Sequence, residues 1–224
     1  MKDFIKKEVA FERVIFFSDA IVAIAITLLA LNLKLDIPLD HHVTFSDLLV
    51  PWRNYLAFIL SFINIAGFWR THHNAFVYIF KMDDRMLFLN ICWLFLIVTL
   101  PFVTTLVSAH FAQTPVICLY SINIFGLAIL QNSIWDYADA KNYLDKEKLP
   151  EITSNRFRLT FNLDMINSLV CVVLSFFFPI LAFIFLFFKL PMFLFATFYL
   201  TGDRKKHYLP SSKTNHDKPA EPQQ

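Results

Sequence analysis

The sequence predicts an all-α, polytopic membrane protein that has six transmembrane helices and places both termini in the cytoplasm. The first observation is composition, because 57% of the 224 residues are hydrophobic and 27 are phenylalanines. That is more apolar material than a soluble domain of this length needs. The second observation is that apolar residues gather into runs of about 20, the length at which a helix crosses the hydrocarbon core. The third is the position of the positive charges, which indicates the orientation.

Six apolar runs are expected to be the spans. The first is interrupted by Ser18, Asp19 and Thr27, the second becomes polar toward its end, and the third contains Pro101. The fifth and sixth come from one long run that Pro179 would fold into a hairpin, because proline breaks the helical hydrogen-bond ladder. One broken span followed by a re-entrant segment is the alternative. In chain order, the expected spans are residues 14–33, 55–76, 86–107, 116–135, 161–178 and 180–200.

Lys and Arg gather on one predicted side of the membrane, in four groups outside or at the ends of the spans. The opposite side carries only Lys34 and Arg53, beside several acids. Because positive residues concentrate in cytoplasmic loops, the rich side is expected to be cytoplasmic and to hold both termini. The four groups are Lys2, Lys6, Lys7 and Arg13; Arg70, Lys81 and Arg85; Lys141, Lys146, Lys148, Arg156 and Arg158; and Arg204, Lys205, Lys206, Lys213 and Lys218.

This pattern predicts the domain organisation. Residues 1–201 are expected to form one six-helix transmembrane domain in the plasma membrane. Residues 202–224 are rich in Lys, Pro, Ser and Gln, a composition that cannot bury a core. They are expected to form a disordered cytoplasmic tail.

Several classes of protein lack their signatures in this chain. A net charge of +2, with no basic patch interleaved with aromatic residues, argues against a nucleic-acid partner. No nucleophile elbow or H-E-x-x-H motif is present, so neither an enzyme nor a cofactor is expected. Three glycines are too few for a phosphate-binding loop or a TVGYG carbonyl filter. Cys92, Cys118 and Cys171 lie inside apolar runs, where a thiol usually packs as a small apolar group.

The first span has one aliphatic face. At 100° per residue, six of its side chains fall within about 40° of one line, and Thr27 lies at the edge of that stripe, roughly 60° from its centre. Asp19 points about 140° away from the centre, and Ser18 lies about 120° off on the opposite flank. The simplest interpretation of such a stripe is contact with lipid or with the protein core. Its members are Phe17, Ala20, Ile24, Leu28, Leu31 and Leu35.

We treat Asp19 as the only acid inside a predicted span, and it needs a partner. An acid at the middle of a membrane costs about 2.5 to 3.5 kcal/mol on insertion scales, so such residues usually pair within the helical bundle. Trp69 and His72 are three residues apart and share a face of the second span, and Asn90 near the same side can add a hydrogen-bonding group. Because His72 and His73 point about 100° apart, they are poorly placed to chelate a metal ion.

These residues carry a resemblance to a known family. Arg13, Phe17, Ser18 and Asp19 form the signature R-x-x-x-F-S-D, and Trp69 with His72 forms W-x-x-H in the next span; Asp84, Asn90 and Pro101 follow in the third. The chain resembles the lysosomal potassium channel family, whose bacterial and archaeal members have six spans per subunit. The resemblance covers residues 13 to 107 with specific motifs. Beyond them it rests on helix number and topology.

The resemblance implies a homotetramer in the lipid bilayer, with four first helices, residues 13–34, lining a central pore. In the family, the constriction on this helix is a large aliphatic ring, followed by a Thr or Ser position and a further aliphatic ring. These positions correspond here to Ile24, Thr27 and Leu31, with Leu28 on the same face. Such rings can gate by dewetting. The implied function is a potassium-preferring cation channel whose partners are K⁺ and other monovalent cations, and K⁺ passes without a resident metal site. The residues implied to lock the pore helix to its scaffold are Arg13, Phe17, Ser18, Asp19, Trp69, His72 and Asn90.

Two other functions stay open from the sequence. The protein could be a proton-conducting channel or a proton-coupled transporter, with Asp19 and His72 as carriers. Transporters of that kind more often show internally repeated halves or glycine-broken helices, which this chain lacks. It could also be a structural membrane protein without flux, although an intramembrane acid with matched partners argues against that.

Overall fold

The protein is a bundle of long helices. The structure, a computed structural model, describes residues 2–34, 37–38, 40–189 and 191, and the side chains from residue 11 onward. Within these residues the only β contact is a single antiparallel bridge pair, Ile79 with Leu144, so the all-α prediction is confirmed. The helices are α1 (Lys2–Ala30), α2 (Phe45–Leu49), α3 (Trp52–Phe76), α4 (Asp84–Ala109), α5 (Thr114–Ala140), α6 (Glu151–Phe177) and α7 (Pro179–Leu186).

Five long helices coincide with the first five predicted spans. In the described part of the chain, four segments are both long and apolar enough to cross a membrane: residues 11–30 of α1, and helices α4, α5 and α6. Helix α3 has 25 residues but carries Arg53, Arg70 and several other polar side chains, which lower its hydropathy. The sixth predicted span begins with α7, and most of residues 190–200 lie outside the described residues. Six spans therefore stay a prediction. The place of Leu35 on the aliphatic stripe and the disordered tail 202–224 stay predictions too, because these residues also lie outside the described ones.

Two differences between the helix boundaries and the predicted spans have a clear physical reason. Helix α1 ends at Ala30, three residues before the predicted end, because the chain tightens there: Leu31 N–H donates to the carbonyl of Leu28, 3.2 Å away. The charges of segment 136–158 predict a solvated connection with room for one short helix. The structure differs: α5 continues to Ala140 and α6 starts at Glu151, so only residues 141–150 are non-helical. Asn142, at a φ of 54°, turns the chain out of α5, a conformation that asparagine tolerates better than most residues.

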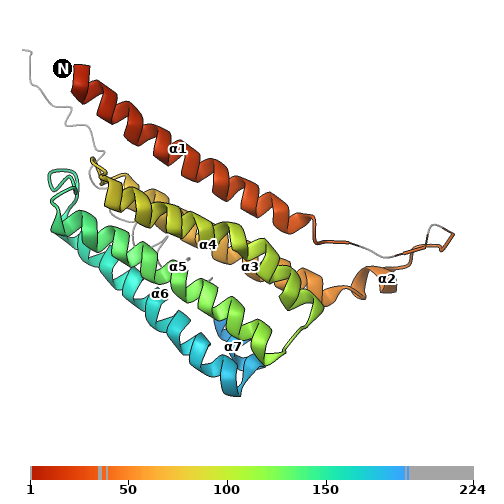
Figure 1. Ribbon diagram of the computed structural model, residues 1–224. Helices are drawn as coiled ribbons and strands as arrows, with labels where there is room; N and C mark the ends of the chain where they lie inside the picture. Colours follow the sequence, from red (N-terminus) through yellow and green to blue (C-terminus); the bar gives the residue numbers. More distant parts are fainter. Residues whose placement is uncertain (1, 35–36, 39, 190, 192–224) are drawn as a thin grey trace, which may run out of the picture.

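Helix α1 lies along one side of the bundle, against α3 and α4, while α5 and α6 pack together on the other side (Figure 1). The chain turns between α6 and α7. Pro179 occupies the first position of α7, where its missing N–H costs nothing. The chain reverses there, since Lys189 lies beside Asp164, 25 residues earlier.

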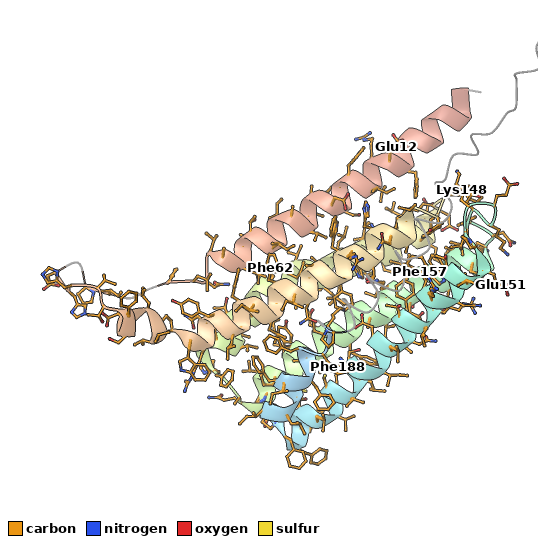
Figure 2. All side chains as sticks on the ribbon, turned by 180° about the vertical axis from the view of Figure 1, so that it is seen from behind. Glu12, Phe62, Lys148, Glu151, Phe157 and Phe188 are labelled. Carbon is orange, nitrogen blue, oxygen red and sulfur yellow. The ribbon has the colours of Figure 1, made fainter. Side chains whose placement is uncertain are left out.

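One end of the bundle gathers three of the four basic segments. The N-terminal part of α1 lies there with the α3–α4 and α5–α6 connections (Figure 1), and Figure 2 places Lys148 and Glu151 at the same end. Backbone hydrogen bonds join the two connections: Phe80 N–H donates to the carbonyl of Tyr143 at 3.1 Å, and Asp145 N–H donates to that of Tyr78 at 2.8 Å. The arrangement agrees with the grouping on which the predicted orientation depends, and the orientation itself stays a prediction.

Candidate functional site at the first helix

The aliphatic stripe of α1 is exposed in the single subunit. Ile24 is 58% exposed, Leu28 40% and Leu31 66%, although they are large apolar side chains. The opposite face packs against α3 and α4 and is almost fully buried, with Val22 at 2% and Leu29 at 0%. Helix α1 is therefore buried on one face and largely exposed on the other, and the stripe predicted from the helical wheel lies on the exposed face.

Thr27 lies on the exposed face too, one turn after Ile24. Its hydroxyl donates to the carbonyl of Ile24 within the same helix, at 2.8 Å. Because the only hydroxyl hydrogen is used in this bond, the outward side of the oxygen offers acceptor lone pairs. The face thus combines aliphatic side chains with one acceptor oxygen, and a cation can contact such an oxygen.

A chain of three hydrogen bonds ties the buried face of α1 to α4 and α3. The Ser18 hydroxyl donates to the carbonyl of Val14 at 2.8 Å, so its oxygen is left as an acceptor for Nδ2 of Asn90, 2.9 Å away. Oδ1 of Asn90 then accepts from Nε2 of His72 at 2.8 Å. All three side chains are buried, at 2%, 0% and 4% exposure. Each polar group finds a partner, as burial in an apolar environment requires.

Aromatic side chains hold the imidazole of His72 in place. Its ring stacks on Phe76 and on Trp93, with centroids 4.2 and 4.3 Å away. His73 instead is exposed and stacks on Trp69. The two histidines thus point to different neighbours, and the described residues contain no group of three or more His, Cys, Asp or Glu able to hold a metal ion.

Asp19 meets α3 beside this chain of hydrogen bonds. Nε1 of Trp69 donates to its Oδ1 at 2.9 Å, so the acid of the first span is bonded to a neutral indole. Ser18 and Asp19 are consecutive, and they attach α1 to two different elements of the scaffold. Five of the seven residues expected in the network are brought together: Ser18, Asp19, Trp69, His72 and Asn90.

Arg13 and Phe17 are not joined to these five. Both are exposed on α1, and the hydrogen bonds of the described side chains leave Arg13 outside the network. Within the residues that the structure describes, no hydrogen bond, ion pair or ring contact joins these two members of the R-x-x-x-F-S-D signature to the network.

Sequence reasoning missed the acid that caps α4. Asp84 was singled out, but the neighbouring Asp83 is the N-cap, and its carboxylate accepts from Met86 N–H at 2.9 Å. The same carboxylate accepts from the hydroxyls of Tyr137 at 2.6 Å and Tyr143 at 3.2 Å. These bonds, led by that from Tyr137, hold the pKa of Asp83 below its ordinary value, and they join the α3–α4 connection to the end of α5. A cap signal, Asp three residues before the first buried residue of an apolar run, could have found it.

The expectation of a single intramembrane acid is wrong. Asp164 lies inside the predicted fifth span, 13 residues from each end of α6, and it is 6% exposed. Its Oδ2 accepts from Nζ of Lys189 at 2.8 Å. Both residues lie in the long apolar run of the fifth and sixth predicted spans, where hydropathy averaged over many residues hides a single charged side chain.

Comparison with known proteins adds the following. Residues 13–101 match the family described as endosomal/lysosomal potassium channel TMEM175. A potassium channel of Chamaesiphon minutus is 30% identical over 191 residues, 75% of this chain and 93% of that protein. A potassium channel of Streptomyces collinus is 27% identical over 168 residues, 73% and 82%. An endosomal/lysosomal proton channel TMEM175 of Gallus gallus is 34% identical over 140 residues, which are 57% of this chain and 28% of that longer protein.

Solved structures show the same fold. The crystal structure of a lysosomal potassium-selective channel TMEM175 homologue from Chamaesiphon minutus superposes with a TM-score of 0.71 at 27% identity, covering 83% of this chain and 97% of that one. The potassium channel MtTMEM175, solved in complex with a nanobody fusion, gives a TM-score of 0.59 at 18% identity and covers 85% and 94%. The second likeness concerns the fold alone.

Proposed function

Because this chain belongs to the endosomal/lysosomal potassium channel TMEM175 family, we propose that it conducts potassium ions across a membrane through a pore lined by α1. The observation that carries the proposal is the contrast between the two faces of that helix. One face is anchored to the scaffold by hydrogen bonds, and the other presents the largely exposed side chains of Ile24, Thr27, Leu28 and Leu31.

The pore requires several copies of the chain. A single exposed stripe borders a path on one side only, so closure around an axis needs the same stripe from other subunits. We propose a homotetramer, in which four copies of Ile24 form one ring and four copies of Leu31 another, each about one turn from Thr27 and on opposite sides of it. Contact of the stripe with lipid is the competing explanation, and the experiment below separates the two.

The proposed conduction follows from the chemistry of the stripe. A ring of aliphatic side chains disfavours water in a narrow passage, so the passage conducts only when it widens or hydrates. Thr27 would offer an acceptor oxygen between the rings, because its hydrogen is bonded to the carbonyl of Ile24. Within a helix the backbone carbonyls are bonded along the axis, so selectivity would depend on how readily each cation sheds water. We expect a preference for K⁺ over Na⁺ that is modest.

Proton conduction is the second candidate. It is favoured by one observation, the likeness to animal relatives that are named proton channels and are 34% identical over the matched region. In that case flux would follow a pH gradient and would persist when K⁺ is replaced by an impermeant cation. The same liposome experiment tests it.

The test is ion flux from liposomes that contain the purified protein, with K⁺ and Na⁺ gradients measured separately. We expect K⁺ flux to exceed Na⁺ flux. Ile24→Asn should erode the preference at least threefold, because a polar ring hydrates the passage. The matched control is Ile91→Asn on α4, since Ile91 is also exposed, at 50%, but lies away from the stripe. It should leave the K⁺ to Na⁺ ratio unchanged.

Two results would contradict the pore assignment. One is unchanged selectivity and conductance in Ile24→Asn, and the other is an equal effect of Ile91→Asn. Thr27→Val keeps the shape of the side chain and removes its oxygen, so we expect it to lower K⁺ conductance while the tetramer stays intact.

A further inference from the structure

A buried ion pair lies in the half of the bundle away from α1. Nζ of Lys189 and Oδ2 of Asp164 are 2.8 Å apart, and their side chains are 5% and 9% exposed. Asp164 is at the midpoint of the 27-residue helix α6 and lies inside the predicted fifth span, residues 161–178. A charge there is costly unless it is paired, and such residues commonly mark a function. Neither the proposed pore nor the hydrogen-bond network of α1 uses it.

Lys189 reaches α3 as well as α6. Its ammonium group lies over the ring of Phe68, and its alkyl chain passes along Gly67, where an ideal Cβ would be only 3.2 Å from Cε. Glycine at this position lets the lysine stem approach the backbone of α3. The pair therefore fixes α3 against α6 and against the segment after α7.

Phe68 precedes Trp69, the residue whose indole bonds to Asp19 of α1. The next turn of α3 carries His72, which bonds to Asn90. Lys189 thus contacts α3 on one side, directly beside the residue by which α3 holds the pore helix on another. The contacts form a continuous path of packed groups from α6 through α3 to α1.

We infer that the Lys189–Asp164 pair is a positioning device for the pore helix, acting through Gly67, Phe68 and Trp69 of α3. The inference rests on the proposed function, since it assigns the pair to the opening of the α1 pore. Widening the passage moves α1, and α3 must either follow or lose its bond to Asp19. A pair that fixes α3 from behind opposes this movement, so its removal should favour opening.

The ion pair is suited to this task because it is directional. Apolar side chains gain about as much from contact with lipid as from contact with α3, so they fix the position of α3 only weakly. An ammonium group between a carboxylate and an aromatic ring accepts one geometry, and its separation would leave two unpaired charges in an apolar surrounding.

The experiment is single-channel recording of the full chain in planar bilayers. The test variant is Lys189→Met with Asp164→Leu, which removes both charges together and leaves no orphan. We expect the open probability to rise at least threefold, while single-channel conductance and the K⁺ to Na⁺ ratio stay unchanged because the aliphatic rings are intact. Lys189→Arg keeps the charge and should stay within twofold of the unmodified chain.

A double-mutant cycle with Trp69→Phe separates positioning from general stability. Trp69→Phe removes the indole donor to Asp19, so both changes interrupt one path. We expect the open probability of the combined variant to be at least threefold lower than the value obtained by multiplying the separate effects of Trp69→Phe and the charge-free variant. Effects that simply multiply would overturn the inference.

The matched control for the charge-free variant is Arg158→Met with Asp139→Leu, which removes an exposed ion pair of 2.6 Å between α6 and α5. An equal rise in open probability in this control would overturn the inference too.

A structural readout keeps the two proposals distinguishable. With the native cysteines replaced, nitroxide labels at Glu12 on α1 and Lys148 beyond α5 report the position of the pore helix relative to the scaffold. The distance distribution should broaden in the charge-free variant and not in the control pair. If the unmodified chain conducts no ions, the proposed function fails and this distribution still decides whether the pair positions α1. If Ile24→Asn acts as expected and the charge-free variant leaves both opening and distances unchanged, only the positioning inference fails.

Discussion

Asn90 is the residue on which the attachment of α1 depends most, and its replacement gives a sharp test. In Asn90→Leu the side chain keeps its approximate volume and loses its two hydrogen bonds, to Ser18 at 2.9 Å and His72 at 2.8 Å. Interhelical side-chain hydrogen bonds in membranes contribute about 0.6 kcal/mol each on average, so their loss costs about 1 kcal/mol. The Nε2–H of His72 is then buried without an acceptor, which adds about 1 to 3 kcal/mol. The expected destabilisation is about 2 to 4 kcal/mol.

The assay is the free energy of unfolding in mixed micelles as the fraction of dodecyl sulfate rises. The matched control is Asn123→Leu, because Asn123 is also buried but donates one side-chain bond, to Thr99 at 2.6 Å. Thr99 still donates to the carbonyl of Leu96, so no donor is stranded and the cost should be about 0.6 kcal/mol, and at most about 1.7.

The double variant Asn90→Leu with His72→Phe removes the stranded donor as well. Replacing both partners by apolar groups of similar shape can be nearly neutral, so we expect it to be more stable than Asn90→Leu alone by at least about 1 kcal/mol. The reasoning is refuted if the double variant is no more stable than the single one, or if Asn90→Leu costs no more than Asn123→Leu.

Two further predictions concern stability. Asp83→Ala should lower the free energy of unfolding by about 0.5 to 2 kcal/mol through the lost cap alone, and Asp84→Ala, one residue on, should do so by less. The pKa of Asp83 lies below the ordinary 3.8, so its contribution is complete above that pH and is lost as the pH falls through the lowered pKa; a cost for Asp83→Ala that is the same at pH 7 and in strong acid would contradict this. Gly126→Ala gains about 1 kcal/mol of helix propensity but brings a Cβ to 2.7 Å from Cδ1 of Leu96, a clash that typically costs about 1 to 3 kcal/mol. Thermal unfolding should show a net loss, and Leu96→Val should restore it; a loss that persists in the double variant would argue against the clash.

Residue patterns predicted the helices and the exposed face of α1 because both depend on local periodicity. Long apolar runs specify where α4 and α5 form, and the wheel places Ile24 opposite the buried side without any knowledge of neighbouring helices. Trp69 was a candidate partner for Asp19 because its face of the second span is polar. The contact of Asp164 with Lys189 joins residues 25 apart, and that of Asp83 with Tyr137 joins residues 54 apart. Pairings of this kind depend on how helices are arranged, and no periodic signal encodes them. The pore-lining role of Ile24, Thr27, Leu28 and Leu31 stays a prediction.

Polar residues decide which face of α1 turns inward. In water, the burial of apolar surface would turn an aliphatic stripe toward the scaffold. In a membrane the lipid tails are as apolar as leucine, so Ile24 gains little from facing the scaffold. Ser18 and Asp19 do gain, because α4 and α3 offer them hydrogen-bond partners in Asn90 and Trp69. The rotation of α1, and with it the direction of the Ile24 stripe one and a half turns further on, is therefore set by these two side chains. The same reasoning accounts for polar side chains of α3: Trp69 supplies the partner of Asp19, and His72 bonds to Asn90, which is the partner of Ser18. These side chains give the helix beside them a defined position.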